Sequence, residues 1–288
     1  MEHLARPAPR LAPFVRCYVQ LDVHLQGQPV ILPIPARSAP VLEFTLGDPN
    51  LVLFTDQRAH EMAHAVNVVG VQTHRRVHLS MRGNLDTFAV VFQPGGLSAL
   101  LSVSAEVLTN QHFDGRAVCG AWVSRLRSRL GASSSFAERV RHADHYLLQR
   151  CPAASVRGDV TWAARALLCR SGNRRMSDLV AASGLSARQF ERRFVSQVGM
   201  PPKVYARVVR FEAALKRKKQ APELRWTDVA HEIGYYDHMH MVRDFHLLAG
   251  ATPSSIAPEV DRIVTEQSER AGRSGVQPER VSLHPLLA

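Results

Sequence analysis

The chain has 288 residues, 45% of them hydrophobic, which is ordinary for a soluble protein with room for two domains. No apolar run approaches the length that spans a bilayer. The arginine- and proline-rich residues 6–10 do not resemble an export signal, so we expect neither a membrane protein nor a secreted one. Four scattered cysteines without a Cys-x-x-Cys pair favour reduced thiols, and therefore a cytoplasmic location, over a disulfide framework or a zinc site.

The net charge of +11 is unevenly distributed. Residues 151–258 contain 17 Lys and Arg against 9 Asp and Glu, a net charge of +8 in about a third of the chain. A basic balance by itself indicates either affinity for polyanions or a solvated surface. This segment is therefore where we look first for nucleic-acid binding.

Residues 1–150 begin with strand-like segments and end with helical ones. Apolar alternation predicts strands at residues 11–23, 30–35, 41–46, 51–54, 66–71 and 86–92. The sequence Gly-Asp-Pro-Asn at residues 47–50 predicts a turn that returns the chain as the next strand. Helices are expected at residues 97–101, around Trp122, Leu126 and Leu130, and at residues 137–149. Strands followed by helices predict a β-rich sandwich or barrel with appended helices.

The remaining chain reads as a linker, a helical domain and a tail. Residues 151–159 are small, polar and interrupted by proline, which is typical of a linker. Residues 160–258 carry helical periodicity throughout, beginning with a helix at 162–169. Residues 259–288 are polar, and we expect a poorly ordered tail. The predicted fold class is therefore α+β with two domains, of which the second is all-α.

Two helix-turn-helix patterns occur in the helical domain. In the first, a helix at residues 177–183 leads to Gly184 at the turn and Ser186 as the cap of the next helix. That helix has Phe190, Phe194 and Val198 on one face and ends at Gly199. A linking helix is expected at residues 202–219, with an apolar face formed by Val204, Val208, Phe211 and Leu215.

The second pattern repeats the first about fifty residues later. Thr227 is expected to cap a short helix, Gly234 makes the turn, and Gly250 ends the second helix. The inward residues of that second helix are expected to be Met241, Phe245 and Leu248.

These motifs resemble the AraC/XylS family of bacterial transcriptional regulators. The resemblance covers residues 160–258, and the motifs that carry it are Gly184-Leu-Ser-Ala-Arg-Gln-Phe-Glu-Arg-Arg-Phe194, Gly199-Met-Pro-Pro-Lys203, Gly234-Tyr-Tyr-Asp-His-Met-His-Met-Val-Arg-Asp-Phe245 and Gly250-Ala-Thr-Pro253. Residues 69–73, 90–96 and 108–111 also resemble the amino-terminal sensor domain of one branch of the family. This implies a small-molecule effector or a homodimer contact, although Pro35-Ala36-Arg37 departs from the family pattern, in which an acidic turn residue is often found.

The resemblance implies sequence-specific binding to the major groove of double-stranded DNA, with RNA polymerase as a further partner to consider. In the first unit, Arg188, Glu191 and Arg192 match reading positions; in the second, the matching residues are Asp237, His238, Met239 and Arg243. Backbone N–H groups near Ser186 and Asp237 suit phosphates, and Arg207 and Arg210 of the linking helix are candidates to face DNA. The alternatives to DNA contact are that these arginines are solvated, that one of them pairs with Glu191, and that His238 is an ordinary surface histidine.

Two other functions remain open. One is an architectural DNA binder that senses no ligand. The other is a cupin-like metal enzyme using His60/His64 and His74/His78, but an i, i+4 spacing brings ligands together only on a helix, and residues 71–79 read as loop or strand. We therefore expect no enzyme, with neither catalytic residues nor a metal or cofactor.

Overall fold

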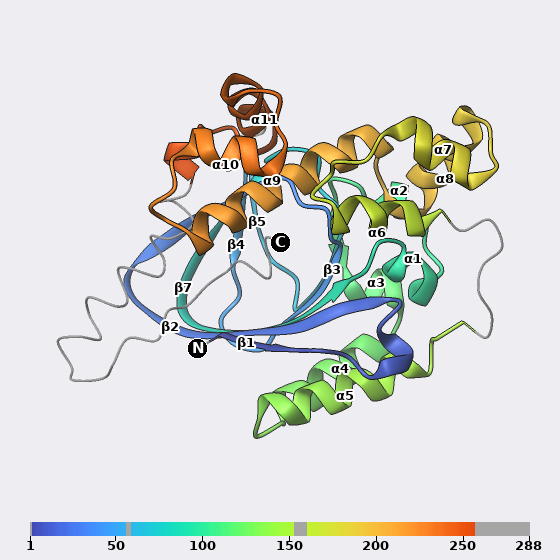
Figure 1. Ribbon diagram of the computed structural model, residues 1–288. Helices are drawn as coiled ribbons and strands as arrows, with labels where there is room; N and C mark the ends of the chain where they lie inside the picture. The colour runs from blue at the N-terminus through green and yellow to red at the C-terminus, as the bar shows by residue number, and fades with distance from the viewer. Residues whose placement is uncertain (1, 56–58, 153–159, 257–288) are drawn as a thin grey trace.

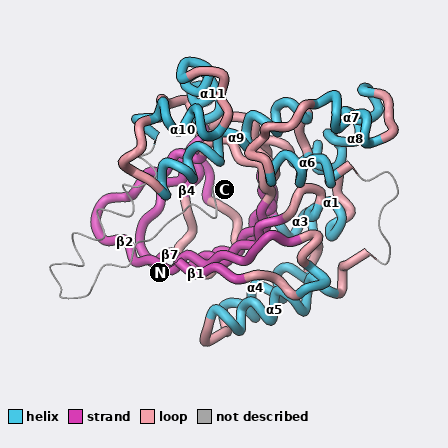
Figure 2. Tube along the Cα trace, in the orientation of Figure 1, coloured by secondary structure: helices cyan, strands magenta, loops and turns pink. Residues whose placement is uncertain are grey.

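The computed structural model describes residues 2–55, 59–152 and 160–256. Its amino-terminal half is a curved antiparallel sheet and its carboxyl-terminal part is helical, which confirms the predicted α+β class (Figure 1). Figure 2 shows the strands as a strongly curved sheet, with helices above and below it. Most of the expected linker at 151–159 and all of the expected tail at 259–288 lie outside the described residues.

All strand pairs in the sheet are antiparallel. The strands are β1 Glu2–Ala5, β2 Val15–Ile34, β3 Val41–Thr45, β4 Leu51–Phe54, β5 His60–Met62, β6 Val66–Val69, β7 Val77–Phe92 and β8 His112–Asp114. They run in the order β1-β2-β7-β3-β6-β8, and β4 pairs with both β5 and the first half of β7.

Two details of the predicted sheet were wrong. The expected segments at 11–23 and 30–35 merge into one long strand, β2, because a register shift between Leu25 and Val30 lets the strand bend without ending. The merged strand starts only at Val15, since Leu11 lies in a 3-10 helix and residues 12–14 form a turn. The turn at residues 47–50 does not make a hairpin between β3 and β4. Instead, β3 pairs with the last residues of β7, whereas β4 pairs with the first residues of β7. The turn therefore leads the chain from one end of β7 to the other.

Helices cover both sides of the sheet. The amino-terminal part has the short 3-10 helix η1 Pro9–Leu11 and α1 Gly96–Leu101, α2 Ala105–Leu108, α3 Gly115–Cys119, α4 Trp122–Gly131 and α5 Phe136–Leu148. The carboxyl-terminal part has α6 Thr161–Cys169, α7 Met176–Ser183, α8 Ala187–Val198, α9 Pro202–Gln220, α10 Trp226–Ile233 and α11 His238–Ala249. In Figure 1, α4 and α5 lie together below the sheet, whereas α6 to α11 lie above it.

Most apolar stripes of the sequence are buried as predicted, although Val204 and Leu215 of the linking helix are only partly buried. Trp122, Leu126 and Leu130 join the core beneath the sheet. Phe190, Phe194 and Met241 belong to the helical core, which also takes in Ala36 and Val71 of the amino-terminal half. The two halves of the chain therefore share apolar packing.

The two helix-turn-helix units are present, one at each end of α9 (Figure 1). Gly184 and Gly234 make the two turns with positive φ angles of 65° and 83°, which glycine adopts at little cost. The prediction that Thr227 caps α10 was wrong, because that helix begins two residues before the expected first residue, with Arg225 at its cap position. None of the helices in the described ranges has the length and apolarity that a bilayer crossing needs.

Candidate nucleic-acid interface and sheet cavity

The amino-terminal turn of α8 is fixed by its cap. The Ser186 hydroxyl accepts a hydrogen bond from the backbone N–H of Gln189, and the Gln189 side chain accepts one from the backbone N–H of Ser186. Two backbone donors are thereby satisfied reciprocally. Phe190, Phe194 and Val198 then anchor the inner face. The opposite face is left to solvent and is free to meet a groove.

Arg188, Glu191 and Arg192 all lie on this exposed face of α8. Within the described residues no salt bridge joins Glu191 to either arginine. The structure thus brings together the three side chains that the sequence predicts to read the first block of DNA. Arg193, which the sequence reasoning did not select, is exposed beside them.

The second unit presents a different set of side chains. The Asp237 carboxylate accepts a hydrogen bond from the backbone N–H of His240 at 2.6 Å and caps α11, so that side chain serves the helix itself. His238 is half-buried, whereas Met239 and Arg243 are exposed. Met241 is fully buried, as predicted.

The two candidate arginines of α9 make hydrogen bonds within the protein. The Arg207 guanidinium donates to Asp244 Oδ1 through Nε at 3.0 Å and Nη2 at 2.6 Å. Arg210 donates to the carbonyl of Gly172 and to the side chain of Asn173, both at 3.3 Å. These contacts hold α9 to its neighbours, and DNA contact by either arginine stays a prediction.

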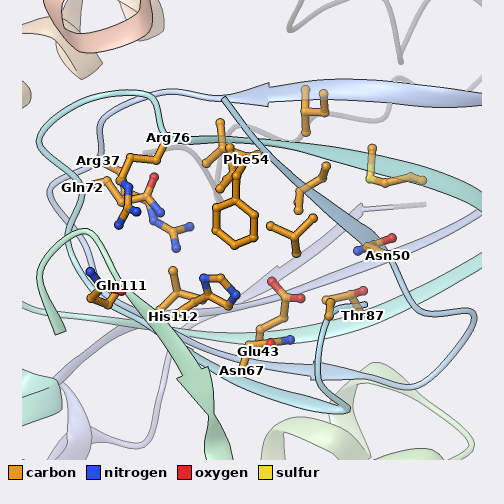
Figure 3. A pocket seen from close by; sticks show the side chains of 18 of the residues that line it. Arg37, Glu43, Asn50, Phe54, Asn67, Gln72, Arg76, Thr87, Gln111 and His112 are labelled. Atoms are coloured by element: carbon orange, nitrogen blue, oxygen red, sulfur yellow. The ribbon is translucent and has the colours of Figure 1, made fainter. Parts of the chain in front are cut away.

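A cavity of about 110 Å³ lies within the amino-terminal half (Figure 3). Its apolar walls come from β2, β4 and β7, and include Leu21, Leu32, Val52, Phe54 and Met81. Its polar groups come from several elements and include Arg37, Glu43, Asn50, Asn67, Gln72, Arg76, Thr87 and His112. A mostly apolar wall with a few convergent polar groups is the general form of a small-molecule site.

Several of these polar groups are poised to interact with an occupant. Among the described residues, the side-chain oxygens of Asn50 and Gln72 are buried without a hydrogen-bond partner. Burial lowers the pKa of Arg37 to about 10, although Glu43 and Glu212 act to raise it. Burial also raises the pKa of Glu43, although Arg37 acts to lower it.

The segment from Ala36 to Ser38 connects this cavity to the helical part. The backbone of Arg37 exchanges two hydrogen bonds of 2.9 Å with Gln72, and both side chains line the cavity. The flanking residues face the helices: the backbone N–H of Ala36 donates to the carbonyl of Leu248 in α11 at 2.8 Å.

Ser38 is hydrogen-bonded to Glu212 of the linking helix α9. Its backbone N–H donates to Glu212 Oε1 and its hydroxyl donates to Oε2, both at 2.6 Å. Glu212 is only 8% exposed. We call these two hydrogen bonds the Ser38–Glu212 clasp. The cavity and the helix that joins the two helix-turn-helix units are therefore held by adjacent residues of one segment.

Sequence reasoning missed both the cavity and the clasp. The available signals were the departure from the family pattern at Pro35-Ala36-Arg37 and the position of Glu212 directly after Phe211 on a helix face predicted to be buried. A carboxylate at a buried position needs a partner. Nothing in the sequence identifies Ser38, 174 residues away, as that partner.

The histidines of the rejected metal site lie on separate elements. His60 is on β5 and His78 on β7, while His64 and His74 lie outside the strands and helices. Across the described residues, no group of three or more His, Cys, Asp or Glu side chains is arranged to hold a metal ion. All four cysteines are unpaired thiols.

Comparison with known families matches the two halves of the chain separately. A helix-turn-helix domain family (HTH_18) matches residues 179–257, and a domain of unknown function (DUF6597) matches residues 3–114. No match is found among curated proteins.

Among solved structures, ToxT from Vibrio cholerae O395 is similar at 10% identity and a TM-score of 0.46, covering 86% of this chain and 98% of that one. ToxT bound to (E)-4-(8-methylnaphthalen-1-yl)but-3-enoic acid is similar at 9% identity and a TM-score of 0.47, with coverages of 83% and 97%. Unsaturated-fatty-acid-bound ToxT from V. cholerae strain SCE256 is similar at 8% identity and a TM-score of 0.47, covering 84% of this chain and 94% of that one.

The helix-turn-helix match falls on α7 to α11, where the structure shows two capped units joined by one long helix. An exposed helix face follows the turn in each unit, within the most basic part of the chain. The chain therefore carries an AraC-type helix-turn-helix domain at residues 179–257, the kind of domain with which transcriptional regulators bind DNA.

Proposed function

We propose that this regulator reads two short DNA blocks with α8 and α11, and that a small molecule in the cavity controls its affinity for them. The observation that carries the second part is the segment Ala36–Ser38, which lines the cavity through Arg37 and holds α9 through the Ser38–Glu212 clasp. Because α9 joins the two reading helices, a change in its position alters their relative placement.

The length of α9 supports reading in successive major grooves. Its 19 residues give a helix of about 28 Å at 1.5 Å per residue. Successive major grooves on one face of B-DNA are about 34 Å apart. On this account Arg188, Glu191 and Arg192 meet the first block and His238, Met239 and Arg243 the second. The helix starts near Ser186 and Asp237 meet phosphates.

The finer assignments complete the proposal. Residues 1–150 form the sensor and dimerisation domain, residues 151–159 the linker, residues 160–258 the DNA-binding domain and residues 259–288 a tail. The protein acts in the cytoplasm, where bacterial DNA is found. A second copy of the chain and RNA polymerase are its protein partners, and it has no catalytic activity of its own.

Compound screening by thermal shift tests the effector. A ligand that binds the folded chain alone stabilises it by about 2.7 kcal/mol at a hundred times its Kd. The matched control is Val52→Phe, because Val52 lines the cavity and a larger side chain fills it. We expect the screen to find compounds that raise the Tm of the wild type but not that of V52F. The same compounds should change the affinity of the wild type for operator DNA. Compounds that stabilise the wild type yet leave DNA affinity unchanged contradict the proposed control.

An architectural DNA binder is the second candidate function. The net positive charge of residues 151–258 favours an architectural binder only if the chain binds DNA without sequence preference. Equal affinity for every DNA sequence, with a steep dependence on salt, would establish that candidate.

A further inference from the structure

The two reading helices carry different chemistry at equivalent positions. Both begin directly after a residue whose side chain caps the helix, Ser186 for α8 and Asp237 for α11. The second helical residue is Arg188 in the first unit and Met239 in the second. The arginine is exposed, and Met239 is 55% exposed. One unit therefore offers a guanidinium group where the other offers a thioether.

Two polar side chains at the start of α11, Asp237 and His240, have partners within the protein, whereas His238 is half-buried and Arg243, one turn further along, is exposed. Asp237 caps the helix through the backbone N–H of His240 at 2.6 Å. The His240 ring packs edge-on against Tyr235 at 5.5 Å and lies 3.9 Å from the carboxylate of Asp244. In the first turn of α11, Met239 is thus the exposed side chain nearest the position from which a recognition helix contacts base edges.

The two side chains suit different bases. A guanidinium group forms two hydrogen bonds with O6 and N7 of guanine, whereas a flexible thioether chain has no strong donor for either atom. The apolar group on the major-groove edge of a base pair is the C5 methyl of thymine. Methionine adapts its three rotatable bonds to an apolar partner.

We propose that the second unit recognises a thymine through its methyl group, contacted by Met239, while the first unit recognises a guanine through Arg188. The inference rests on the proposed reading of DNA by both helices. The two blocks of the operator therefore differ in kind: a G·C pair in the first stands where a T·A pair stands in the second.

Replacing thymine by uracil removes this methyl and nothing else. The probe is a set of duplexes derived from an operator selected with the full-length chain, each with one thymine of either block replaced by deoxyuridine. Burial of one methyl group is worth about fourfold in affinity. We expect one such replacement in the second block to weaken wild-type binding by about fourfold.

Two variants assign the loss to Met239. Met239→Ala should bind the thymine duplex more weakly and show no further loss with uracil. Leu247→Ala is the matched control, since Leu247 is 53% exposed on the last turn of the same helix and should keep the full uracil penalty. Circular dichroism checks that both variants fold.

The outcomes separate the inference from the function on which it rests. A second block that contains no thymine, wild-type indifference to uracil throughout that block, or an undiminished penalty in M239A would overturn the role of Met239 while leaving a sequence-specific regulator. Failure of the full-length chain to select any sequence would instead overturn the proposed reading of DNA itself.

Discussion

Ser38→Ala removes one of the two hydrogen bonds of the clasp between the amino-terminal half and α9. The lost bond joins the Ser38 hydroxyl to Glu212 Oε2 at 2.6 Å, and the backbone bond to Oε1 remains. Hydrogen bonds to charged groups contribute about 1.5–3 kcal/mol, and this carboxylate is buried, so water does not replace the hydroxyl. At a pH where Glu212 is ionised, we expect a loss of about 2 kcal/mol in the free energy of unfolding.

The same substitution changes the pH dependence of stability. Burial raises the pKa of Glu212 above its ordinary value of 4.5, while hydrogen bonds from Ser38 and the charges of Arg16 and Arg37 lower it, with a net rise. The folded chain therefore holds this proton to higher pH than the unfolded chain. The stability that this provides is fully present below 4.5 and is lost as the pH rises through the raised pKa. Without the hydroxyl the pKa rises further, and the decline extends to higher pH.

Urea denaturation at about pH 5 and about pH 8, followed by circular dichroism, measures both effects. Ser104→Ala is the control, because its hydroxyl makes an exposed hydrogen bond of 3.4 Å to Ser196 across the same pair of domains. We expect it to change stability by less than about 0.5 kcal/mol. A loss in S38A no larger than that in S104A, at both pH values, would refute the clasp.

Three further substitutions test other parts of the account. Asp237→Ala removes the cap of α11 and should lower the stability of that helix by about 1 kcal/mol. Faster amide hydrogen exchange in α11 would show this loss, and unchanged exchange would contradict the capping role of Asp237. Arg207→Met removes the close ion pair of Asp244, which is only 1% exposed and keeps the His240 ring at 3.9 Å. It should lower the free energy of unfolding by about 3 kcal/mol, measured by thermal denaturation. If instead only DNA affinity falls, Arg207 is a DNA contact. Arg192→Ala should weaken binding to the selected operator more than binding to random DNA, and equal losses would reduce Arg192 to a phosphate contact.

The helical domain could be predicted in detail because its signals are local. Apolar residues such as Phe190 and Phe194 recur at helical spacing, and Gly184 and Gly234 occupy turns that need a positive φ angle. The misplaced cap at Thr227 shows the limit of such signals. The first residues of α10 carry no side-chain cap, so the helix start depends on packing.

The amino-terminal half was harder to predict because its pairings are distant in sequence. Strand β7 meets β3 and β4 with different parts of its length, and no local pattern indicates which residues of β7 face each strand. The cavity arises from the same distant pairings, since its walls come from β2, β4 and β7 together. Arg37 could be noticed in the sequence as unusual, but its position between the cavity and α9 follows only from the fold.

Selection of binding sites from random DNA by the full-length chain, at near-physiological salt, tests the central claim most directly. The account predicts two short enriched blocks about one helical turn apart, roughly 34 Å from centre to centre, one for α8 and one for α11. Strong, salt-sensitive binding without any enriched sequence would contradict it, because both exposed helix faces would then contact only the phosphate backbone.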